Sequence, residues 1–138
     1  MITEDYVSFE TAKLLKELGF DSRECLNSPY YAYNGEGEFS GPTWDTEYVA
    51  PTLQMARKWL REKHNTHIEI RITNHSMSKM VNVIKYYWVM ASTETARWCD
   101  ESTLHTKTFD TPEEAEDNAI RHALENLIQN DAQTKDKE

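Results

Sequence analysis

The chain has 138 residues, a length that favours one domain able to bury a core without disulfide or metal support. Only 4 Gly and 4 Pro argue against a disordered or linker-rich chain, and no apolar run approaches the roughly 18 residues of a membrane helix. The formal charge of -9 argues against a dedicated nucleic-acid-binding domain, because such domains are usually net basic.

The N-terminal third predicts one helix followed by one or two strands. Ser8 is a favourable N-cap for the helix, and Gly19 supplies the left-handed residue that ends it. The aromatic stretch YYAYN at 30–34 is typical of a strand. The glycines and the proline of GEGEFSGP at 35–42 predict a loop, and DTEYV at 45–49 is a candidate return strand.

A second helix is predicted from APTLQMARKWLREKH, residues 50–64, with Pro51 in its first turn. At about 100° per residue, Arg57, Lys58 and Arg61 fall together on one side. The other side is an apolar arc of Leu53, Met55, Ala56, Trp59 and Leu60. Three bases on one face could contact nucleic-acid phosphates. The net charge favours instead a solvated face, or one that faces the protein's own acidic segments, with Arg57 exposed and Trp59 in the core.

Three strands and a third helix are predicted in the C-terminal half. HIEIRI at 67–72 alternates apolar and polar residues, as a half-buried strand does. The stretch 81–91 is apolar on both faces and predicts a central strand, while 103–109 suits an outer strand. Thr111 and Glu114 form a capping box that begins the last helix.

These elements predict an α+β fold, in which a mixed or antiparallel sheet of about four strands carries three amphipathic helices, mostly on one face. We expect a single domain over residues 1–129 and a disordered polar tail over residues 130–138. The predicted core consists of Leu14, Leu18, Leu53, Trp59, Leu60, Ile68, Ile70, Tyr87, Val89, Ala119, Ala123 and Leu127.

The sequence holds no motif that predicts catalysis or a metal site. His64 and His67 have H-x-x-H spacing, but a second pair at ligand spacing is missing, and the first would end a helix while the second opens a strand. A nucleophile elbow, a P-loop and a paired-carboxylate motif are missing as well. We therefore expect a protein that is not an enzyme and that uses no cofactor and no metal.

Two aromatic stretches, at 30–34 and 85–90, leave a choice open. On strands, alternate rings face opposite sides, so one set would pack under the helices. The other set could also be covered, which we favour. Otherwise it would form a stacking surface for single-stranded nucleic acid or a hot spot for protein binding.

Charge is distributed unevenly along the chain. Residues 1–50 hold 10 acidic and 3 basic residues, residues 51–107 hold 5 and 9, and residues 108–138 hold 9 and 3. The acidic ends predict a basic protein as partner, bound through an acidic surface. The alternative is a nucleic-acid-binding module that uses the basic face of the second helix, although the acidic flanks argue against that partner. Membrane association is not expected, and the sequence does not indicate an oligomeric state.

Three segments of the sequence are specific enough to indicate a protein family: YVSFETAKLLKELGFD, APTLQMARKWLREKH and FDTPEEAEDN. Together they resemble a family of small uncharacterised proteins of gut bacteria, their phages and mobile elements, over most of residues 6–129. No activity, cofactor or catalytic residue is established for that family, so the resemblance implies only a cytoplasmic accessory protein. The N-terminus has no signal-peptide pattern, and Cys25 and Cys99 are expected to be free thiols in a reducing cytosol.

Overall fold

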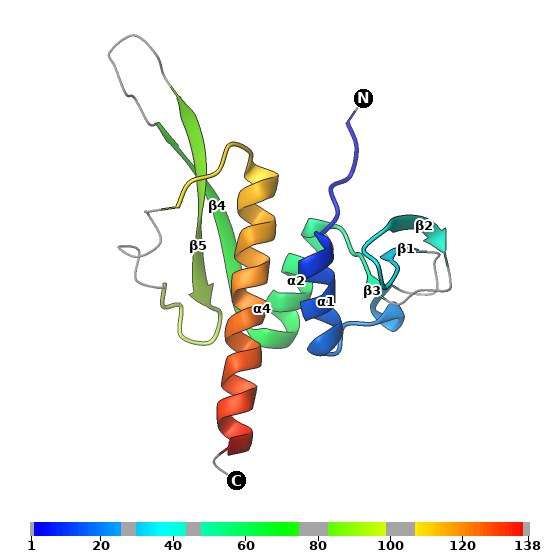
Figure 1. Ribbon diagram of the computed structural model, residues 1–138. Coiled ribbons are helices and arrows are strands. Elements are labelled where there is room, and N and C mark those ends of the chain that lie inside the picture. Colours follow the sequence, from blue (N-terminus) through cyan, green and yellow to red (C-terminus); the bar gives the residue numbers. More distant parts are fainter. Residues whose placement is uncertain (1, 26–29, 44–47, 75–82, 99–106, 137–138) are drawn as a thin grey trace. The chain divides into compact units, whose positions relative to one another are not determined.

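The structure is a computed structural model that describes residues 2–25, 30–43, 48–74, 83–98 and 107–136 (Figure 1). The described residues contain both helices and antiparallel strands, which confirms the predicted α+β class. In chain order, the elements are α1 (Phe9–Glu17), the 3-10 helix η1 (Ser22–Cys25), β1 (Tyr30–Tyr33), β2 (Phe39–Thr43), β3 (Tyr48–Val49), α2 (Leu53–His64), β4 (Thr66–Asn74), β5 (Ile84–Ser92) and α4 (Pro112–Asp136).

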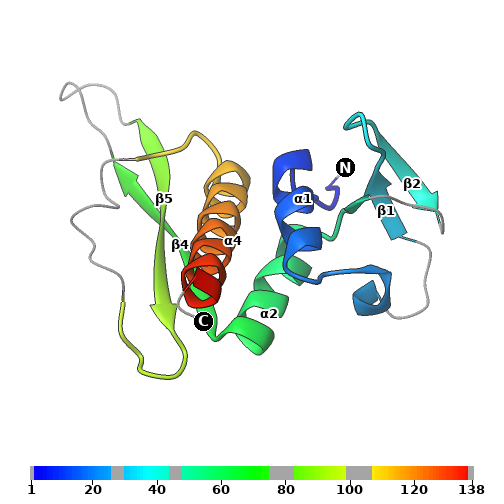
Figure 2. The same cartoon turned by 60° about the horizontal axis from the view of Figure 1, so that its bottom comes forward.

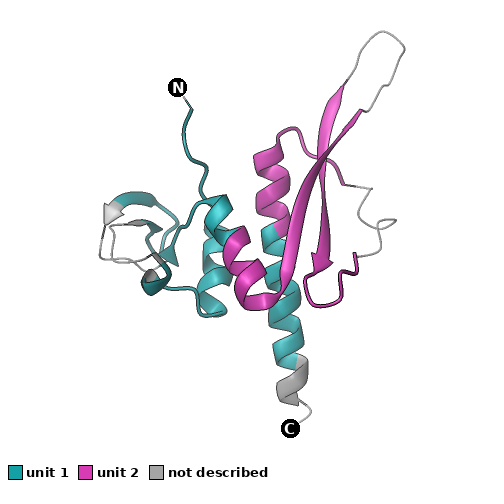
Figure 3. Ribbon diagram, turned by 180° about the vertical axis from the view of Figure 1, so that it is seen from behind, with its two compact units in different colours: residues 1–56, 120–138 teal, residues 57–119 magenta. Residues whose placement is uncertain are grey.

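The chain divides into two compact units, which are coloured separately in Figure 3. The first unit comprises residues 1–56 and 120–138, and the second comprises residues 57–119. The boundaries fall inside α2 and inside α4, so each of these helices contributes residues to both units. The single domain expected over residues 1–129 stays a prediction.

The strands of the described residues form two small antiparallel sheets, which corrects the prediction of one sheet of about four strands. The first unit holds a three-stranded sheet in the order β2-β1-β3, and the second holds the pair β4-β5. Sequence patterns predict which segments are strands, but they do not fix which strands pair, because pairing depends on contacts between distant segments.

In the first unit, the N-terminal segment is tied to the start of α2. The Val7 amide donates to the Pro51 carbonyl at 3.1 Å, and the Leu53 amide donates to the Asp5 carbonyl at 3.0 Å. Ser8 caps α1 as predicted, because its hydroxyl accepts a hydrogen bond from the Thr11 amide. The start of α1 is therefore fixed both by its cap and by this backbone pairing.

The buried face of α1 differs from the prediction. Thr11, Ala12 and Leu15 are buried, whereas Leu14 and Leu18 are only half-buried. The Thr11 hydroxyl is hydrogen-bonded to the Ser8 hydroxyl at 2.9 Å, which satisfies its polar group in a buried place. The leucines alone suggested a different face, because a threonine is not expected in an apolar stripe.

In the second unit, β4 and β5 form a regular pair of nine residues each, running from Thr66 opposite Ser92 to Asn74 opposite Ile84 (Figure 2). Burial decreases along this pair. Ile68 and Trp88 are buried, but Ile72 is 61% exposed and Ile84 is 52% exposed.

The stretch 81–91, predicted as a central strand because both its faces are apolar, is therefore covered only in part. Its buried part is the four-residue run from Trp88 to Ala91. The outer strand predicted over 103–109 falls mostly outside the described residues. Of its described part, residues 107–109, Phe109 forms an isolated antiparallel bridge to Tyr86.

The last helix is longer than predicted. Thr111 caps it through a hydrogen bond from the Glu114 amide, as the capping box indicates. The helix then continues to Asp136, so most of the segment predicted as a disordered polar tail is helical. Residues 130–136 contain no glycine or proline that would end a helix, and the polar residues Gln133 and Lys135 are compatible with one.

Candidate functional site

Six aromatic side chains of the first unit form one connected group. Neighbouring ring centroids lie 4.7 to 5.5 Å apart, within the range of favourable ring contacts. Phe39 is 46% exposed and the other five rings are half-buried, so the group reaches solvent. We refer to these residues as the aromatic cluster: Tyr6, Phe9, Tyr31, Tyr33, Phe39 and Tyr48.

The three-stranded sheet places four of these rings on one face. Along β1, Tyr31 and Tyr33 point to the same side because strand residues alternate. Tyr33 pairs with Phe39 of β2 and with Tyr48 of β3, and directly paired residues share a face. The sheet thus carries Phe39, Tyr33 and Tyr48 side by side, while Ala32, on the other face, is buried.

Two glycines make room for the rings. A Cβ atom on Gly41 would lie 2.5 Å from Cδ1 of Tyr31, so that ring covers the backbone of β2 at this point. Gly37 has a φ of 86°, and a Cβ there would lie 3.0 Å from the Phe9 ring. The stretch 35–42, predicted as a loop, is therefore in part the strand β2, and two of its glycines, Gly37 and Gly41, lie against aromatic rings.

The cluster also contains polar groups that fix its rings. The Tyr33 hydroxyl donates to the Val7 carbonyl at 2.7 Å. The Tyr6 and Tyr31 rings lie with their centroids 4.7 Å apart. Burial raises the pKa of Tyr6, and the neighbouring Tyr31 and Glu4 raise it further.

Charged side chains surround the cluster. The turn before β2 is held by Asn34, whose Oδ1 accepts from the Glu36 amide at 2.9 Å and from the Glu38 amide at 3.0 Å. This turn lies against the Phe9 ring through Gly37. We refer to three exposed carboxylates here as the acidic border: Glu4, Glu36 and Glu38.

Two lysines of α1 lie over rings of the same cluster. The Lys13 ammonium is 4.6 Å from the Phe9 ring centroid, and the Lys16 ammonium is 4.7 Å from the Tyr48 ring centroid. Both distances are typical of cation–π contacts. The α1 side of the cluster therefore carries positive charge, and the border near the turn and the N-terminal segment carries negative charge.

In the second unit, the structure separates the three bases that the sequence placed on one face. The Arg57 guanidinium donates from Nη1 to Oε1 of Glu116 at 3.2 Å and from Nη2 to the Ile68 carbonyl. The Arg57 side chain is 32% exposed and the Glu116 side chain 16%. Lys58 and Arg61 are exposed. The expectation of an exposed Arg57 is wrong, because its long side chain leaves the solvent face and joins α2 to β4 and α4.

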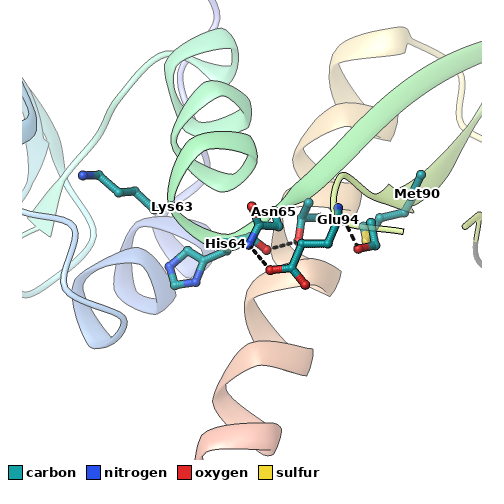
Figure 4. Close-up of a pocket in the computed structure, with 8 residues that line it drawn as sticks. Lys63, His64, Asn65, Met90 and Glu94 are labelled. Carbon is teal, nitrogen blue, oxygen red and sulfur yellow. Dashed lines mark hydrogen bonds between the residues drawn. The ribbon is translucent and has the colours of Figure 1, made fainter. Parts of the chain in front are cut away.

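A pocket of about 500 Å³ lies where α2 ends and β4 begins (Figure 4). Asn65 adopts a left-handed φ of 53° there, as residues after helix ends often do. Its side-chain Nδ2 donates to Oε1 of Glu94 at 2.8 Å, and its backbone carbonyl accepts from the backbone amide of Thr93 at 2.8 Å. Lys63 and His64 also line the pocket. These polar groups serve mainly to hold the turn that ends α2.

The imidazoles of the H-x-x-H pair have different aromatic neighbours. The His64 ring packs against the Trp59 ring at 4.7 Å between centroids, and the His67 ring contacts the Trp98 ring at 6.2 Å. Within the part of the chain that the structure describes, no three His, Cys, Asp or Glu side chains gather as metal ligands would. Cys99 and His105 lie outside that part.

Comparison with protein-family models, with curated proteins and with solved structures found no match. None of the helices in the described ranges is long and apolar enough to cross a membrane.

Of the surfaces described, the aromatic cluster has the strongest features of a binding site. The sequence pattern marked Tyr31 and Tyr33 as aromatic strand residues, with coverage by other elements as the favoured outcome. It did not associate Tyr6, Phe9 or Phe39 with them. The local sequence held one indication of the cluster, namely the two aromatic residues Tyr6 and Phe9 close to Ser8. Trp88, also singled out, is buried and donates from Nε1 to Oδ1 of Asn118 at 3.0 Å.

Proposed function

We propose that the protein is a cytoplasmic accessory protein that binds another protein through the aromatic cluster and the acidic border. The observation that carries this proposal is a solvent-reaching group of six rings with exposed carboxylates beside it. Tyrosine and other aromatic residues contribute much of the binding energy in protein interfaces, since they bury large areas at low conformational cost.

Charge supports a basic partner. The first 50 residues hold 10 acidic and 3 basic side chains, and the acidic border lies in that segment. At physiological ionic strength, screening acts over about 8 Å, so carboxylates grouped around one surface act together on an approaching charge. A basic protein surface would therefore be attracted to the cluster, and a phosphate backbone would be repelled.

The chemistry of the cluster supports binding rather than catalysis. Its polar groups are phenol hydroxyls, which are protonated at neutral pH even at their ordinary pKa of about 10, and the pKa of Tyr6 is raised further. A general base needs the opposite change, since it must lose its proton near the working pH. We therefore propose that the protein is not an enzyme.

Nucleic-acid binding through Arg57, Lys58 and Arg61 is the competing hypothesis. It is less well supported, because Arg57 directs its guanidinium toward Glu116 and Ile68. Of these three residues, Lys58 and Arg61 stay exposed, and two contacts are fewer than phosphate binding usually requires. We expect no binding of random duplex or single-stranded DNA at low micromolar protein in about 0.15 M salt.

The experiment is affinity capture from the source cell with four forms of the protein. Wild type is compared with Phe39→Ser and with the charge reversal Glu36→Lys/Glu38→Lys. The matched control is Glu62→Lys, which reverses an exposed carboxylate on α2. Thermal melting first shows that each variant is folded.

We expect a partner that is retained by wild type and the control, is lost with both site variants, and elutes early in a salt gradient. A partner that all four forms retain equally would contradict the proposed surface. Sub-micromolar DNA binding that Lys58→Glu/Arg61→Glu abolishes would establish the competing hypothesis instead.

A further inference from the structure

We propose that β4 is a dimerisation edge, along which two copies of this chain pair antiparallel about a two-fold axis at Ile70. This dimer uses the second unit alone, so it does not depend on the proposed function of the aromatic cluster. Three features of β4 point to it: the direction of its backbone groups, its lack of the usual edge protection, and the order of its charges.

The ladder between β4 and β5 leaves every second residue of β4 with its backbone groups directed away from β5. Tyr86 of β5 exchanges both backbone hydrogen bonds with Phe109, at 2.9 and 2.8 Å, and stands directly opposite Ile72. Ile72 is therefore a non-hydrogen-bonded position of the antiparallel pair, and its N–H and C=O point outward. The register is unbroken, so the same groups of Ile70 also point outward.

The inner end of this edge is covered by Arg57. Its Nη2 donates to the carbonyl of Ile68, the next residue of β4 whose groups face away from β5. Within the part of the chain that the structure describes, β4 pairs with β5 alone, and no other group bonds to the outward amides and carbonyls of Ile70 and Ile72. Unpaired backbone groups of this kind are a template for a further strand.

The strand β4 lacks the devices that usually protect an edge. Its nine residues, THIEIRITN, contain no proline, glycine or lysine, and its register against β5 has no bulge. Ile72 is 61% exposed, and Ile84 of β5, its diagonal neighbour on the same face, is 52% exposed. A strand added along β4 would pack beside Ile72 and reduce this exposed apolar area.

The charges of β4 favour a second copy as that strand. Glu69 and Arg71 flank Ile70 on the opposite face, where Nε of Arg71 donates to Oε1 of Glu69 at 3.2 Å. In an antiparallel pair centred on Ile70, Glu69 of each copy stands directly opposite Arg71 of the other. The antiparallel complement of Glu-Ile-Arg is thus Glu-Ile-Arg itself, and the four charges alternate in sign. Opposite charges on directly opposed strand residues stabilise a pair, whereas like charges destabilise it.

Neighbouring positions of the axis lose this match. An axis at Glu69 or at Arg71 opposes that residue to its own copy, so that like charges meet. An axis at Ile72 opposes Arg71 to Thr73, which is neutral. Of the axes through residues 69–72, the one at Ile70 therefore pairs unlike charges.

The backbone allows the same register. Because the groups of Ile70 point outward, the two copies of this residue exchange a pair of hydrogen bonds across the axis. Ile72 of each copy stands opposite Ile68 of the other, so isoleucine faces isoleucine on the apolar side. The Ile68 carbonyl, which already accepts from Arg57, has a second lone pair for the Ile72 amide of the second copy. A contact of this kind is isologous and closes with two copies.

Sedimentation equilibrium over a concentration series measures the dimer dissociation constant (Kd) of the full chain. Glu69→Arg makes all four charges at the axis positive, and Arg71→Glu makes all four negative. The exchange Glu69→Arg/Arg71→Glu restores the alternation. The control is Arg61→Glu, which reverses an exposed charge on α2. Thermal melting first shows that each variant is folded.

We expect wild type and the control to dimerise with the same Kd. Each single reversal should raise Kd at least about tenfold, and the exchange should return it to within about threefold of wild type. An equimolar mixture of the two single-reversal variants should form a mixed dimer, because two acidic residues of one chain then oppose two basic residues of the other. The contact between residues 69 and 71 within each chain stays broken in this mixture, so its rescue reports pairing across the axis.

Four results would overturn the inference. Wild type that stays monomeric over the whole series excludes the dimer, and a dimer whose Kd no variant changes lies on another surface. Folded chains of the exchange variant and of the mixture that both fail to dimerise exclude the axis at Ile70. A monomeric chain that captures a foreign protein, and loses it with Arg71→Glu, shows that the edge takes a strand of another protein instead. None of these results bears on the proposed function, which is tested at Phe39, Glu36 and Glu38.

Discussion

Replacing Arg57 by alanine tests how the second unit is held together. The guanidinium makes two hydrogen bonds, to Glu116 of α4 and to the Ile68 carbonyl of β4, and so joins three elements. Removing it leaves a carboxylate that is 16% exposed without this partner, and it frees a strand carbonyl. Both groups must then find water or lose a hydrogen bond.

The expected cost follows from these two contacts. A hydrogen bond that involves a charged group contributes about 1.5–3 kcal/mol, and both bonds of Arg57 come from its charged guanidinium. Because the Arg57 side chain is 32% exposed, solvent screens its ion pair with Glu116. That pair therefore contributes little, as exposed pairs do, and most of the cost comes from the bond to the Ile68 carbonyl. Together, we expect Arg57→Ala to lower the free energy of unfolding by about 1.5–3 kcal/mol.

Urea denaturation followed by tryptophan fluorescence measures this loss. Arg61→Ala is the matched control, since Arg61 is an exposed arginine of the same helix, and its cost should stay within about 0.5 kcal/mol. A double-mutant cycle with Glu116→Gln should give a coupling energy of about 0.5–1.5 kcal/mol. Equal losses for the two arginine variants, with no coupling to Glu116, would refute the bridging role.

Three further changes have definite expected results. Trp59→Ala should lower the free energy of unfolding by about 3–5 kcal/mol in the same urea assay, because the ring is 7% exposed; a loss below about 1 kcal/mol would show that the ring is not in the core. Gly41→Ala should lower the melting temperature, because the new Cβ would meet the Tyr31 ring at 2.5 Å; an unchanged melting temperature would contradict that packing. The pKa of Tyr6 is raised above 10.0, so the folded state holds this proton more tightly, and the stability it contributes is present below pH 10 and is lost at higher pH. Above pH 10, wild type should therefore lose stability more steeply than Tyr6→Phe, and parallel pH profiles would be evidence against a raised pKa.

Much of the local structure could be predicted because single residues specify it. Ser8 and Thr111 cap their helices through their own side chains, and the alternation from Ile68 to Ile72 marks β4. These features depend on neighbours a few residues apart, which a sequence displays directly. The α+β class follows from the same local patterns.

The interactions that decide between the two candidate surfaces, the basic face of α2 and the aromatic cluster, are not local. Arg57 and Glu116 are 59 residues apart, and only the folded chain shows that the guanidinium turns from solvent to this carboxylate. The aromatic cluster is assembled from the N-terminal segment, α1 and three strands, so that Tyr6 and Phe39 meet across 33 residues of sequence. Gly41 gave a loop signal, although it serves to admit the Tyr31 ring. Composition alone does not separate these two uses of glycine.

The most direct test of the central claim is a chemical-shift map of the 15N-labelled protein as an arginine-rich peptide is added. If the aromatic cluster is the binding surface, the amide signals that move will belong to Tyr6–Phe9, Tyr31–Tyr33 and Glu36–Phe39, and those of residues 57–61 will stay in place. Shifts centred on 57–61, or no shifts as the peptide is added in excess, would contradict the claim.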